Sequence, residues 1–487
     1  MFKDYVLKFS SAQYSNQILL IDDENFDEVT HYSAGFKAHG FEVALYTDDI
    51  SFRIMYEDKL KNQDNKLVIL AKSSSFIPYD LQRRFKAYTL SMGNLFPKLN
   101  FDTLKAYSDL DLDLLSLAYL NNFDDWQTQK QTEEFLNKHV YSTENVQAYL
   151  KILYCDLMKQ TKTVTTYDEW FEISEVKAKI DIFATRFYLE FDTSEIDIIF
   201  TDYILTHFGK ISSEMNRNTP ILVSRAMEFM HECSSKFVII VMDGMSEFDW
   251  RIISKSFGDI LYEKTAVFAM IPTTTSISRQ CLLSNKYPSQ LIEPWKQSKE
   301  KQEFISCAKN MGYADNQIGY ERGYNAQFSS FVRCGAVIVN DVDDIVHAQH
   351  QGRLGMLNDI GVLSDQHKLA DMTKRFLNDG FDVYISADHG NAPSMGMGKL
   401  IGTGVEMETR SRKMIVLQNF ADKETLLQKY RLIDYPKYYL QKDFDYLICN
   451  TGDSFDATGD CVITHGGISI NEVIVPFIKI KAVNNNG

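Results

Sequence analysis

Short apolar runs alternate with polar stretches of helical length along the first hundred residues. These runs are QILLID at 17–22, FEVALYT at 41–47 and KLVILAK at 66–72. Strands that are separated by helices usually pair side by side in parallel. The pattern therefore predicts a small Rossmann-like α/β domain over residues 1–100.

The pattern becomes helical between residues 101 and 232. Apolar side chains recur at spacings of three and four in DLLSLAYLNNF (113–123), VQAYLKILYCDLMKQ (146–160) and SRAMEFMHEC (224–233). Such spacing places the apolar residues on one face of each helix. We expect a helical connector here, with its many Phe and Tyr side chains packed in the core.

Strand-like runs return after residue 232, and helical patterns such as LSDQHKLADMTKRFLNDG (363–380) separate several of them. The runs are KFVIIVMDG (236–244), AVFAMIPTT (266–274), GAVIVNDVDD (335–344), FDVYISADHG (381–390), RKMIVLQ (412–418) and EVIVPFIKIK (472–481). This alternation is typical of a mostly parallel sheet with helices on both faces. It predicts a third domain over residues 233–487, in which residues 395–445 interrupt the pattern and are expected to form a cap.

Composition indicates an ordinary globular protein, since 45% of the 487 residues are hydrophobic and 24% are charged. The net charge of −15 gives no broad basic surface for a nucleic-acid backbone. The N-terminus lacks a signal-peptide pattern, and no uncharged apolar run approaches the roughly 20 residues of a membrane span. The seven cysteines are scattered and form no CxxC pair. We therefore expect a cytoplasmic protein with reduced thiols and no contact with a membrane.

Polar side chains with metal-binding or nucleophilic chemistry follow four of the strand-like runs. Asp243 follows FVIIVM, and Thr275 lies in IPTTTSISRQ, where a helix is expected from Ser276. The N–H groups at the start of that helix would favour a phosphate beside Thr275. Taken alone, Asp243 is equally typical of a strand-to-turn aspartate, and the hydroxyls are typical of helix N-caps.

A third candidate lies in the segment VNDVDDIVHAQHQG. Asp343 and His347 are four residues apart and share one face if this segment is helical, so that they could hold one ion together. A surface ion pair is the alternative interpretation. Asp344 and His350 could take the same roles if the register differs.

The remaining candidates are the adjacent pair Asp388-His389 in VYISADHG and His465 in THGGISINEVIVPF. Open α/β sheets bind ligands beyond the carboxyl ends of their strands. All of these side chains are predicted at one such edge. The whole set therefore indicates a metal-binding or catalytic site more strongly than any single member does.

In order and approximate spacing, VMDGMS, PTTTSISRQ, DDIVH, SADHGN and THGGISINEVIVPF resemble the motifs of the alkaline phosphatase superfamily. PTTTSISRQ, SADHGN and THGGISINEVIVPF are more similar still to the PglZ domain, which is known from BREX phage-defence systems and PorX-type response regulators. The resemblance covers roughly residues 235–480. It implies an alkaline-phosphatase-like α/β fold with a metal-dependent phosphoester hydrolase site.

The resemblance also implies a role for each residue. It assigns Asp243, Thr275, Asp388 and His389 to one divalent metal ion, and Asp343, His347 and His465 to a second. Thr275 is the implied nucleophile because it completes the superfamily pattern Pro-Thr-x-Thr, although Thr273, Thr274 and Ser276 stay open as alternatives. Mixed histidine and carboxylate ligands favour Zn²⁺, with Mn²⁺ as the second choice.

The expected reaction is phosphoester hydrolysis through a phosphothreonine intermediate, in phage defence or signalling. Arg279, one helical turn beyond Thr275, could bind a phosphate oxygen, although an ion-paired arginine is the alternative. Because no other cation is placed near the nucleophile, a phosphodiesterase acting on nucleotides or oligonucleotides is favoured over a phosphomonoesterase.

Two further interpretations belong to other classes of function. The chain could be a non-catalytic structural or regulatory PglZ subunit that binds defence-system proteins and uses zinc for stability. The run ILLIDDEN resembles the start of a receiver domain, but Lys72 follows the third strand where a phosphoacceptor aspartate would stand. A homodimer is compatible with the sequence.

Overall fold

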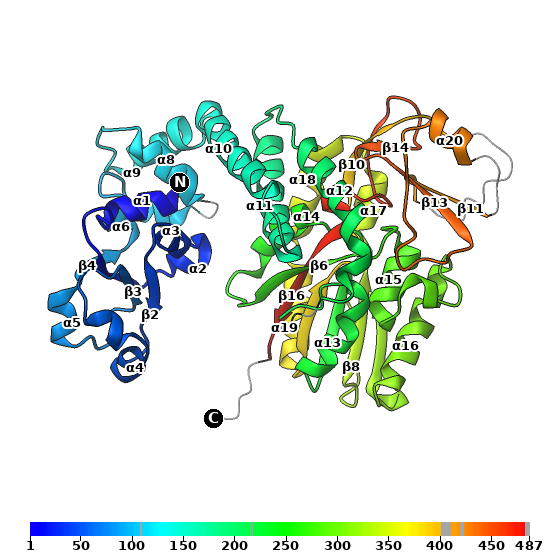
Figure 1. Cartoon of the computed structure of the whole chain (residues 1–487), viewed down its shortest axis with the longest axis horizontal. Coiled ribbons are helices and arrows are strands. Elements are labelled where there is room, and N and C mark those ends of the chain that lie inside the picture. Colours follow the sequence, from blue (N-terminus) through cyan, green and yellow to red (C-terminus); the bar gives the residue numbers. More distant parts are fainter. Residues whose placement is uncertain (108–109, 215, 217, 401–410, 419–422, 483–487) are drawn as a thin grey trace. The chain divides into compact units, whose positions relative to one another are not determined.

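The computed structural model describes residues 1–107, 110–214, 216, 218–400, 411–418 and 423–482. The chain divides into two compact units, Met1–Ile152 and Leu153–Gly487. Figure 1 shows that each unit has a sheet of its own, blue in the first unit and green to red in the second. The domain boundaries expected at residues 100 and 232 stay a prediction.

The first unit is built on a parallel sheet in the order β2-β3-β1-β4. Its strands are β1 (Gln17–Asp22), β2 (Glu42–Leu45), β3 (Leu67–Ala71) and β4 (Lys86–Leu90). The helices before and between them are α1 (Phe2–Phe9), α2 (Phe26–Thr30), α3 (Ser33–Ala38), α4 (Asp49–Leu60) and α5 (Tyr79–Arg84). The predicted parallel α/β unit is confirmed. Strand β4 was not predicted, because only its last residue is buried and the sequence shows no apolar run there.

Helices α6 (Met92–Leu95), α7 (Phe101–Ala106), α8 (Leu112–Leu120) and α9 (Gln129–Phe135) follow this sheet, and α10 (Thr143–Thr161) crosses the end of the unit. Lys72 follows β3, and its Nζ donates a hydrogen bond to the backbone carbonyl of Asp22 at 2.5 Å. A lysine therefore stands where a receiver domain would carry its phosphoacceptor aspartate.

The second unit contains a six-stranded sheet in the order β6-β16-β9-β5-β8-β7. Its strands are β5 (Phe237–Met242), β6 (Glu263–Phe268), β7 (Ile318–Arg322), β8 (Cys334–Val339), β9 (Asp382–Ser386) and β16 (Ile474–Ile480). Strands β9, β5, β8 and β7 are parallel, whereas β16 is antiparallel to both β9 and β6. Five strands therefore run in one direction, and the predicted mostly parallel sheet is confirmed.

Helices cover both faces of this sheet, since every residue of the central strands β5 and β8 is buried. The helices are α11 (Tyr167–Arg186), α12 (Ser194–Ile211), α13 (Ala226–Cys233), α14 (Glu247–Ile253), α15 (Thr275–Ser284), α16 (Glu300–Asn310), α17 (Asp341–Ala348), α18 (Gly352–Asp365), α19 (Lys368–Asn378) and α21 (Ile470–Val473). The pattern over 363–380 predicted one helix, but a positive φ of 53° at His367 separates α18 from α19. None of the helices in the described ranges combines the length and apolar character of a membrane span.

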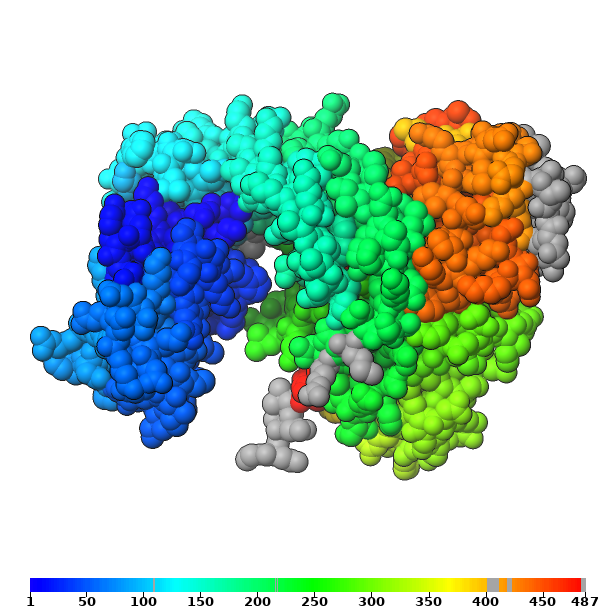
Figure 2. All heavy atoms as spheres, viewed as in Figure 1, coloured from blue at the N-terminus to red at the C-terminus, as the bar shows by residue number. Residues whose placement is uncertain are grey.

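An insertion between β9 and β16 forms two small sheets. It contains β10 (Ala392–Gly396), β11 (Met414–Gln418), α20 (Lys423–Lys429), β12 (Leu432–Asp434), β13 (Phe444–Cys449), β14 (Asp453–Ser454) and β15 (Cys461–Thr464). The sheet orders are β14-β10-β15 and β11-β13-β12. The run RKMIVLQ is thus a strand of the insertion rather than of the main sheet. In Figure 2 the insertion, in orange, lies against the green segment that follows Thr275, where the rings of Tyr287 and Tyr439 stack 4.7 Å apart.

Candidate two-metal active site

The carboxyl ends of the parallel strands bring the sequence-predicted side chains together. Asp243 follows β5, Asp388 follows β9, and Thr275 begins the helix after β6. The other members, His389, Asp343, His347 and His465, lie on the same edge of the sheet. The six histidines and aspartates among these residues form two groups of three that could each hold a metal ion. The ligand atoms within each group lie within 4.8 Å of one another.

We call the first group, Asp243, Asp388 and His389, the inner cluster; all three side chains are buried. Asp388 Oδ1 accepts hydrogen bonds from the backbone N–H groups of Gly244 at 3.2 Å and His389 at 3.1 Å. Asp243 Oδ2 pairs with the guanidinium of Arg279. Asp243 Oδ1 and Asp388 Oδ2 are buried and have no hydrogen-bond partner. Each carboxylate thus has one oxygen held by the protein and one oxygen free for a ligand.

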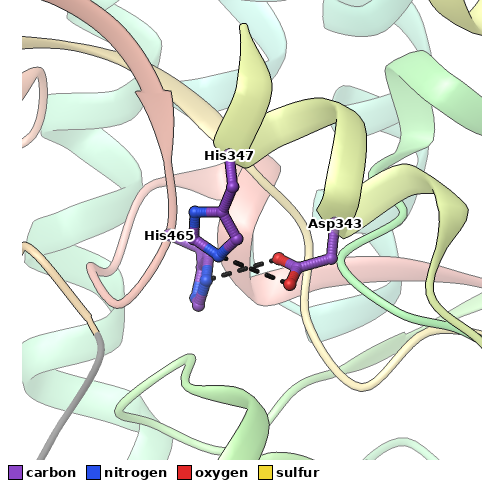
Figure 3. Close-up of side chains that lie close together, drawn as sticks. All are labelled: Asp343, His347 and His465. Atoms are coloured by element: carbon purple, nitrogen blue, oxygen red, sulfur yellow. Dashed lines mark ion pairs between the residues drawn. The ribbon is translucent and has the colours of Figure 1, made fainter.

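The outer cluster consists of Asp343, His347 and His465, which Figure 3 shows converging from α17 and from the loop between β15 and α21. Asp343 Oδ2 lies 3.4 Å from His347 Nε2, and Asp343 Oδ1 lies 3.5 Å from His465 Nε2. The four-residue spacing does place Asp343 and His347 on one face of α17. The His347 side chain is 37% exposed, whereas that of His465 is 4% exposed. This cluster therefore reaches from the interior to solvent.

The hydrogen bonds of two histidines determine which ring nitrogen faces the site. His389 Nδ1 lies 3.0 Å from the carbonyl of Gly390, and His465 Nδ1 lies 3.0 Å from the carbonyl of Thr273. A carbonyl can only accept, so Nδ1 must carry the proton in both rings. The Nε2 lone pairs therefore point into the site, which is the tautomer that a metal-binding histidine needs. The two rings stack with centroids 4.1 Å apart, which joins the two clusters.

Thr275 lies at the first position of α15, and its Oγ1 donates a hydrogen bond to His389 Nε2 at 3.0 Å. Thr273 is different, because its buried hydroxyl donates to the carbonyl of Gly467 at 2.8 Å and accepts from the N–H of Gly466 at 3.1 Å. Thr274 and Ser276 line the same cleft as Thr275. Among these hydroxyls, the contact with the inner cluster belongs to Thr275.

Arg279, which the sequence predicted to bind a phosphate oxygen, is fully buried. Its Nη1 pairs with Asp243, and its Nε pairs with Glu300 Oε2 at 2.6 Å. Nη1 also lies 3.8 Å from Asp388 Oδ2. Glu300 in turn accepts a hydrogen bond from Tyr320 Oη at 2.6 Å. In this structure the guanidinium contacts carboxylates beneath the cleft, and a contact with substrate stays a prediction.

Two glycines permit the close approach of the loops that hold the histidines. A Cβ at Gly390 would lie 1.9 Å from the carbonyl oxygen of Asn471, and one at Gly466 would lie 1.6 Å from Ser411 Oγ. Gly466 also has a φ of 108°, which L-residues rarely adopt. Any larger side chain at either position would push the loops apart and move the histidines.

Burial and charge give the ionisable groups of the site unusual pKa values. Burial raises the pKa of Asp243 well above its ordinary value, Asp388 raises it further, and Arg279 only partly opposes them. Burial and the neighbouring His389 lower the pKa of His465 to about 3, so His465 is neutral at pH 7. Lone pairs on histidine nitrogens and carboxyl oxygens therefore face one another at the buried inner cluster, and a divalent cation would relieve the repulsion that raises the pKa of Asp243. The donor set fits two such ions.

A cleft of about 850 Å³ opens above the two clusters. The lining residues that the sequence did not suggest are Trp295, Lys296, Gln297, Ser298, Arg322, Asn340, Ser411 and Arg412. Arg322 is the last residue of β7, and the others come from loops, from the 3₁₀ helix Gln297–Lys299 and from the insertion, where no periodicity marks a residue as facing a ligand. The basic run RSRK before β11 was the one signal available for Arg412.

Comparison with known families places most of the second unit in a described group. Residues 223–480 match the model of the BREX system PglZ alkaline phosphatase-like domain. This match spans more than half of the 487 residues of the chain. No curated protein sequence matches the chain.

Several solved structures share part of the arrangement at low identity. Murine ectonucleotide pyrophosphatase/phosphodiesterase 5 is 10% identical, with 50% of this chain and 88% of that chain covered and a TM-score of 0.37. The human protein of the same name is 12% identical, with 50% and 87% covered and a TM-score of 0.37. Phosphonoacetate hydrolase from Sinorhizobium meliloti 1021, in complex with phosphonoacetate, is 10% identical, with 52% and 92% covered and a TM-score of 0.31.

Proposed function

The chain belongs to the family of PglZ alkaline phosphatase-like domains, and we propose that it is a metal-dependent phosphoester hydrolase with Thr275 as its nucleophile. One observation supports this assignment above the others. The Thr275 hydroxyl lies 3.0 Å from His389 Nε2, beside two buried carboxylate oxygens that have no hydrogen-bond partner. A hydroxyl that only capped a helix would not need such neighbours.

Each cluster would hold one divalent ion. Asp243, Asp388 and His389, together with the Thr275 hydroxyl, would bind one of them, and the outer cluster would bind the other. Two histidines beside a single carboxylate in the outer cluster favour Zn²⁺, with Mn²⁺ as the alternative. When bound, such ions supply positive charge that lowers the pKa of a nearby hydroxyl and neutralises phosphate oxygens.

The residues of the chain orient the reaction. Thr275 Oγ1 releases its proton to water and bonds to phosphorus while the bond to the leaving oxygen breaks. The leaving oxygen keeps the bonding electron pair and takes up a proton from water. The N–H groups at the start of the ten-residue helix α15 face the incoming phosphate and favour its negative charge. Water then attacks phosphorus of the threonine ester in a second displacement, which restores the hydroxyl and releases phosphate from a monoester or a phosphomonoester from a diester.

The class of ester depends on the cations that face the cleft. The sequence favoured a phosphodiester of nucleotides or oligonucleotides because Arg279 was the one cation expected near the nucleophile. The structure buries Arg279 and lines the cleft with Lys296, Arg322 and Arg412. That reason for a diester therefore no longer applies, and we propose the broader activity, phosphoester hydrolysis, with the ester class decided by these cations.

A non-catalytic PglZ subunit is the competing function, since the family is defined by its place in a phage-defence system. In that case metal ions would only stabilise the fold, and protein partners would use other surfaces. The unpaired oxygens beside Thr275 favour the enzyme, because a purely structural site needs no nucleophile at its edge.

The decisive experiment compares Thr275→Ala with Ser276→Ala, its neighbour on the cleft wall. Purified protein loaded with Zn²⁺ or Mn²⁺ is assayed with p-nitrophenyl phosphate and bis-p-nitrophenyl phosphate. Loss of the nucleophile should lower kcat at least about a thousandfold, whereas Ser276→Ala should stay within about fivefold. Mass spectrometry after an acid quench should find phosphate on the Thr275 peptide. Wild-type turnover equal to that of Thr275→Ala would support the non-catalytic subunit.

A further inference from the structure

The insertion is attached to the outer cluster through the three consecutive residues 411–413. Ser411 Oγ donates a hydrogen bond to the carbonyl of His465 at 3.1 Å. Lys413 Nζ lies 3.1 Å from Glu472 Oε1, and both side chains are only 1% exposed. Glu472 also accepts from the N–H of Gly467 at 2.9 Å. The segment just before β11 is therefore fixed to the loop that holds His465.

Arg412 lies between these two anchors and lines the cleft. Its carbonyl accepts a hydrogen bond from the N–H of Phe455 at 2.7 Å, which fixes its backbone. Its Nη1 donates to Asp456 Oδ1 at 2.6 Å, and Asp456 Oδ2 accepts from Ser454 Oγ at 2.8 Å. The side chain is 47% exposed. One edge of the guanidinium is thus held by a buttressed carboxylate while nearly half of the side chain faces solvent.

The guanidinium is close to the outer cluster. Arg412 lines the same cleft as Asp343, His347 and His465, and the neighbouring Ser411 donates a hydrogen bond to the carbonyl of His465. The other cations of the cleft are also ion-paired, and what distinguishes Arg412 is its anchored place beside the loop that holds His465. Arg322 pairs with Glu300, and Lys296 lies 3.0 Å from Glu293 Oε1.

We propose that Arg412 binds a charged non-bridging oxygen of the substrate phosphate and makes phosphomonoesters the preferred substrates. A monoester carries one more charged oxygen than a diester, and a planar guanidinium with five N–H donors suits that oxygen. A diester carries a second ester group at the same place, which gains nothing from a cation. This inference rests on the proposed hydrolysis at Thr275 and adds its substrate class.

The test measures kcat/KM for p-nitrophenyl phosphate and bis-p-nitrophenyl phosphate in wild type, Arg412→Ala and Arg412→Lys. Loss of a charged hydrogen bond should lower the monoester value about 10- to 150-fold, and the diester value should change less than about threefold. Arg412→Lys should recover part of the loss, because the charge stays while the fork geometry is lost.

The matched control is Arg431→Ala, which breaks a similar pair with Asp453 at 2.7 Å. Arg431 does not line the cleft, so both esters should be hydrolysed as in wild type. Equal losses for both esters in Arg412→Ala, or no loss for either, would overturn the proposal.

A measurement of inorganic phosphate binding tests the role of Arg412 even if the proposed hydrolysis at Thr275 is wrong. If wild type and Thr275→Ala turn over both esters equally, calorimetry with phosphate on the metal-loaded protein replaces the assay. Affinity should fall about 10- to 150-fold in Arg412→Ala and stay unchanged in Arg431→Ala. Unchanged affinity in Arg412→Ala would then refute the phosphate contact itself.

Discussion

Two groups of buried charges in the second unit are organised in opposite ways. The inner cluster leaves Asp243 Oδ1 and Asp388 Oδ2 without a hydrogen-bond partner. A second group, which we call the support network, consists of Lys177, Asp181, Asp197 and Arg353. Both groups lie in the interior, yet only the first has carboxylate oxygens to spare.

Every carboxylate oxygen of the support network is engaged. Lys177 Nζ lies 3.0 Å from Asp181 Oδ2 and 3.5 Å from Asp197 Oδ2, and Arg353 also pairs with Asp181. Asp181 Oδ1 accepts from Thr193 Oγ1 at 3.1 Å, and Asp197 Oδ1 accepts from the N–H of Ile470 at 3.2 Å. Two cations thus balance two anions. A buried carboxylate with an oxygen that accepts no hydrogen bond, rather than burial alone, therefore indicates a site for a ligand.

The strongest test of this difference makes the same substitution, aspartate to asparagine, once in each group. Asp388→Asn keeps the acceptor for the N–H groups of Gly244 and His389 but turns an amide toward the ion. It should lower kcat at least about a thousandfold and abolish the rise in Tm on adding Zn²⁺. That rise corresponds to about 2.7 kcal/mol at a hundredfold excess over Kd.

The matched variant is Asp181→Asn in the support network. It should keep the metal-dependent rise in Tm and should retain turnover within about tenfold, although its starting Tm should be lower. Differential scanning fluorimetry with and without Zn²⁺ measures both variants. A full metal response in Asp388→Asn would remove the distinction between the two groups.

The next test removes one cation from each group. Arg279→Met leaves Asp243 without its cation, and Lys177→Met leaves Asp197 without its cation. Each change should cost about 3–5 kcal/mol in the free energy of unfolding of metal-free protein. Zn²⁺ should restore part of the loss in Arg279→Met, because the ion replaces the missing charge beside Asp243. It should restore nothing in Lys177→Met.

Urea unfolding with and without Zn²⁺ provides the measurement. Arg225→Met is the control, because its pair with Glu228 is about half exposed, at 48% and 51%, and surface pairs contribute only about 0–1 kcal/mol. Equal rescue of Arg279→Met and Lys177→Met by Zn²⁺ would mean that the metal stabilises the unit in general and does not act at the inner cluster.

The convergence of the inner cluster was predictable because its members follow buried strands. Asp243 and Asp388 end apolar runs, and parallel strands bring their carboxyl ends to one edge of a sheet. The proximity of Asp343 and His347 was equally predictable, since a four-residue spacing on a helix is a local property. The mostly parallel sheet was predictable too, because the period of the apolar residues indicates each strand and each helix between strands.

The support network and Arg412 were not predictable from such patterns. Lys177, Asp197 and Arg353 belong to three different helices, and their pairing depends on how those helices pack. Arg412 lies within residues 395–445, which were expected to interrupt the sheet pattern, and no period of apolar residues there indicates which side chain faces the cleft. Arg279 has the helical spacing expected for a cleft residue, yet its long side chain extends beneath the cleft to Asp243.

The smallest expected effect concerns the acid stability of the support network. Burial raises the pKa of Asp181, but Arg353 and Lys177 outweigh it and lower the pKa to about 2 from an ordinary 3.8. A depressed pKa adds stability above the unfolded value of 3.8, and this stability is lost as the pH falls through about 2. The loss should be about 2.4 kcal/mol, and Asp181→Asn should remove that part of the acid sensitivity of metal-free protein.

Urea unfolding at several pH values between about 4 and 2 measures this loss. Asp453→Asn is the control, because the pKa of Asp453 is shifted in the opposite direction. Burial raises this pKa, although the charges of Arg431 and Lys413 oppose the rise. A raised pKa adds stability only at low pH, so this variant should not reduce the acid loss. An acid loss in Asp181→Asn as large as in wild type would show that Arg353 and Lys177 do not hold Asp181 ionised. The support network would then resemble the inner cluster, where burial and Asp388 raise the pKa of Asp243 and favour its protonated form until a cation binds.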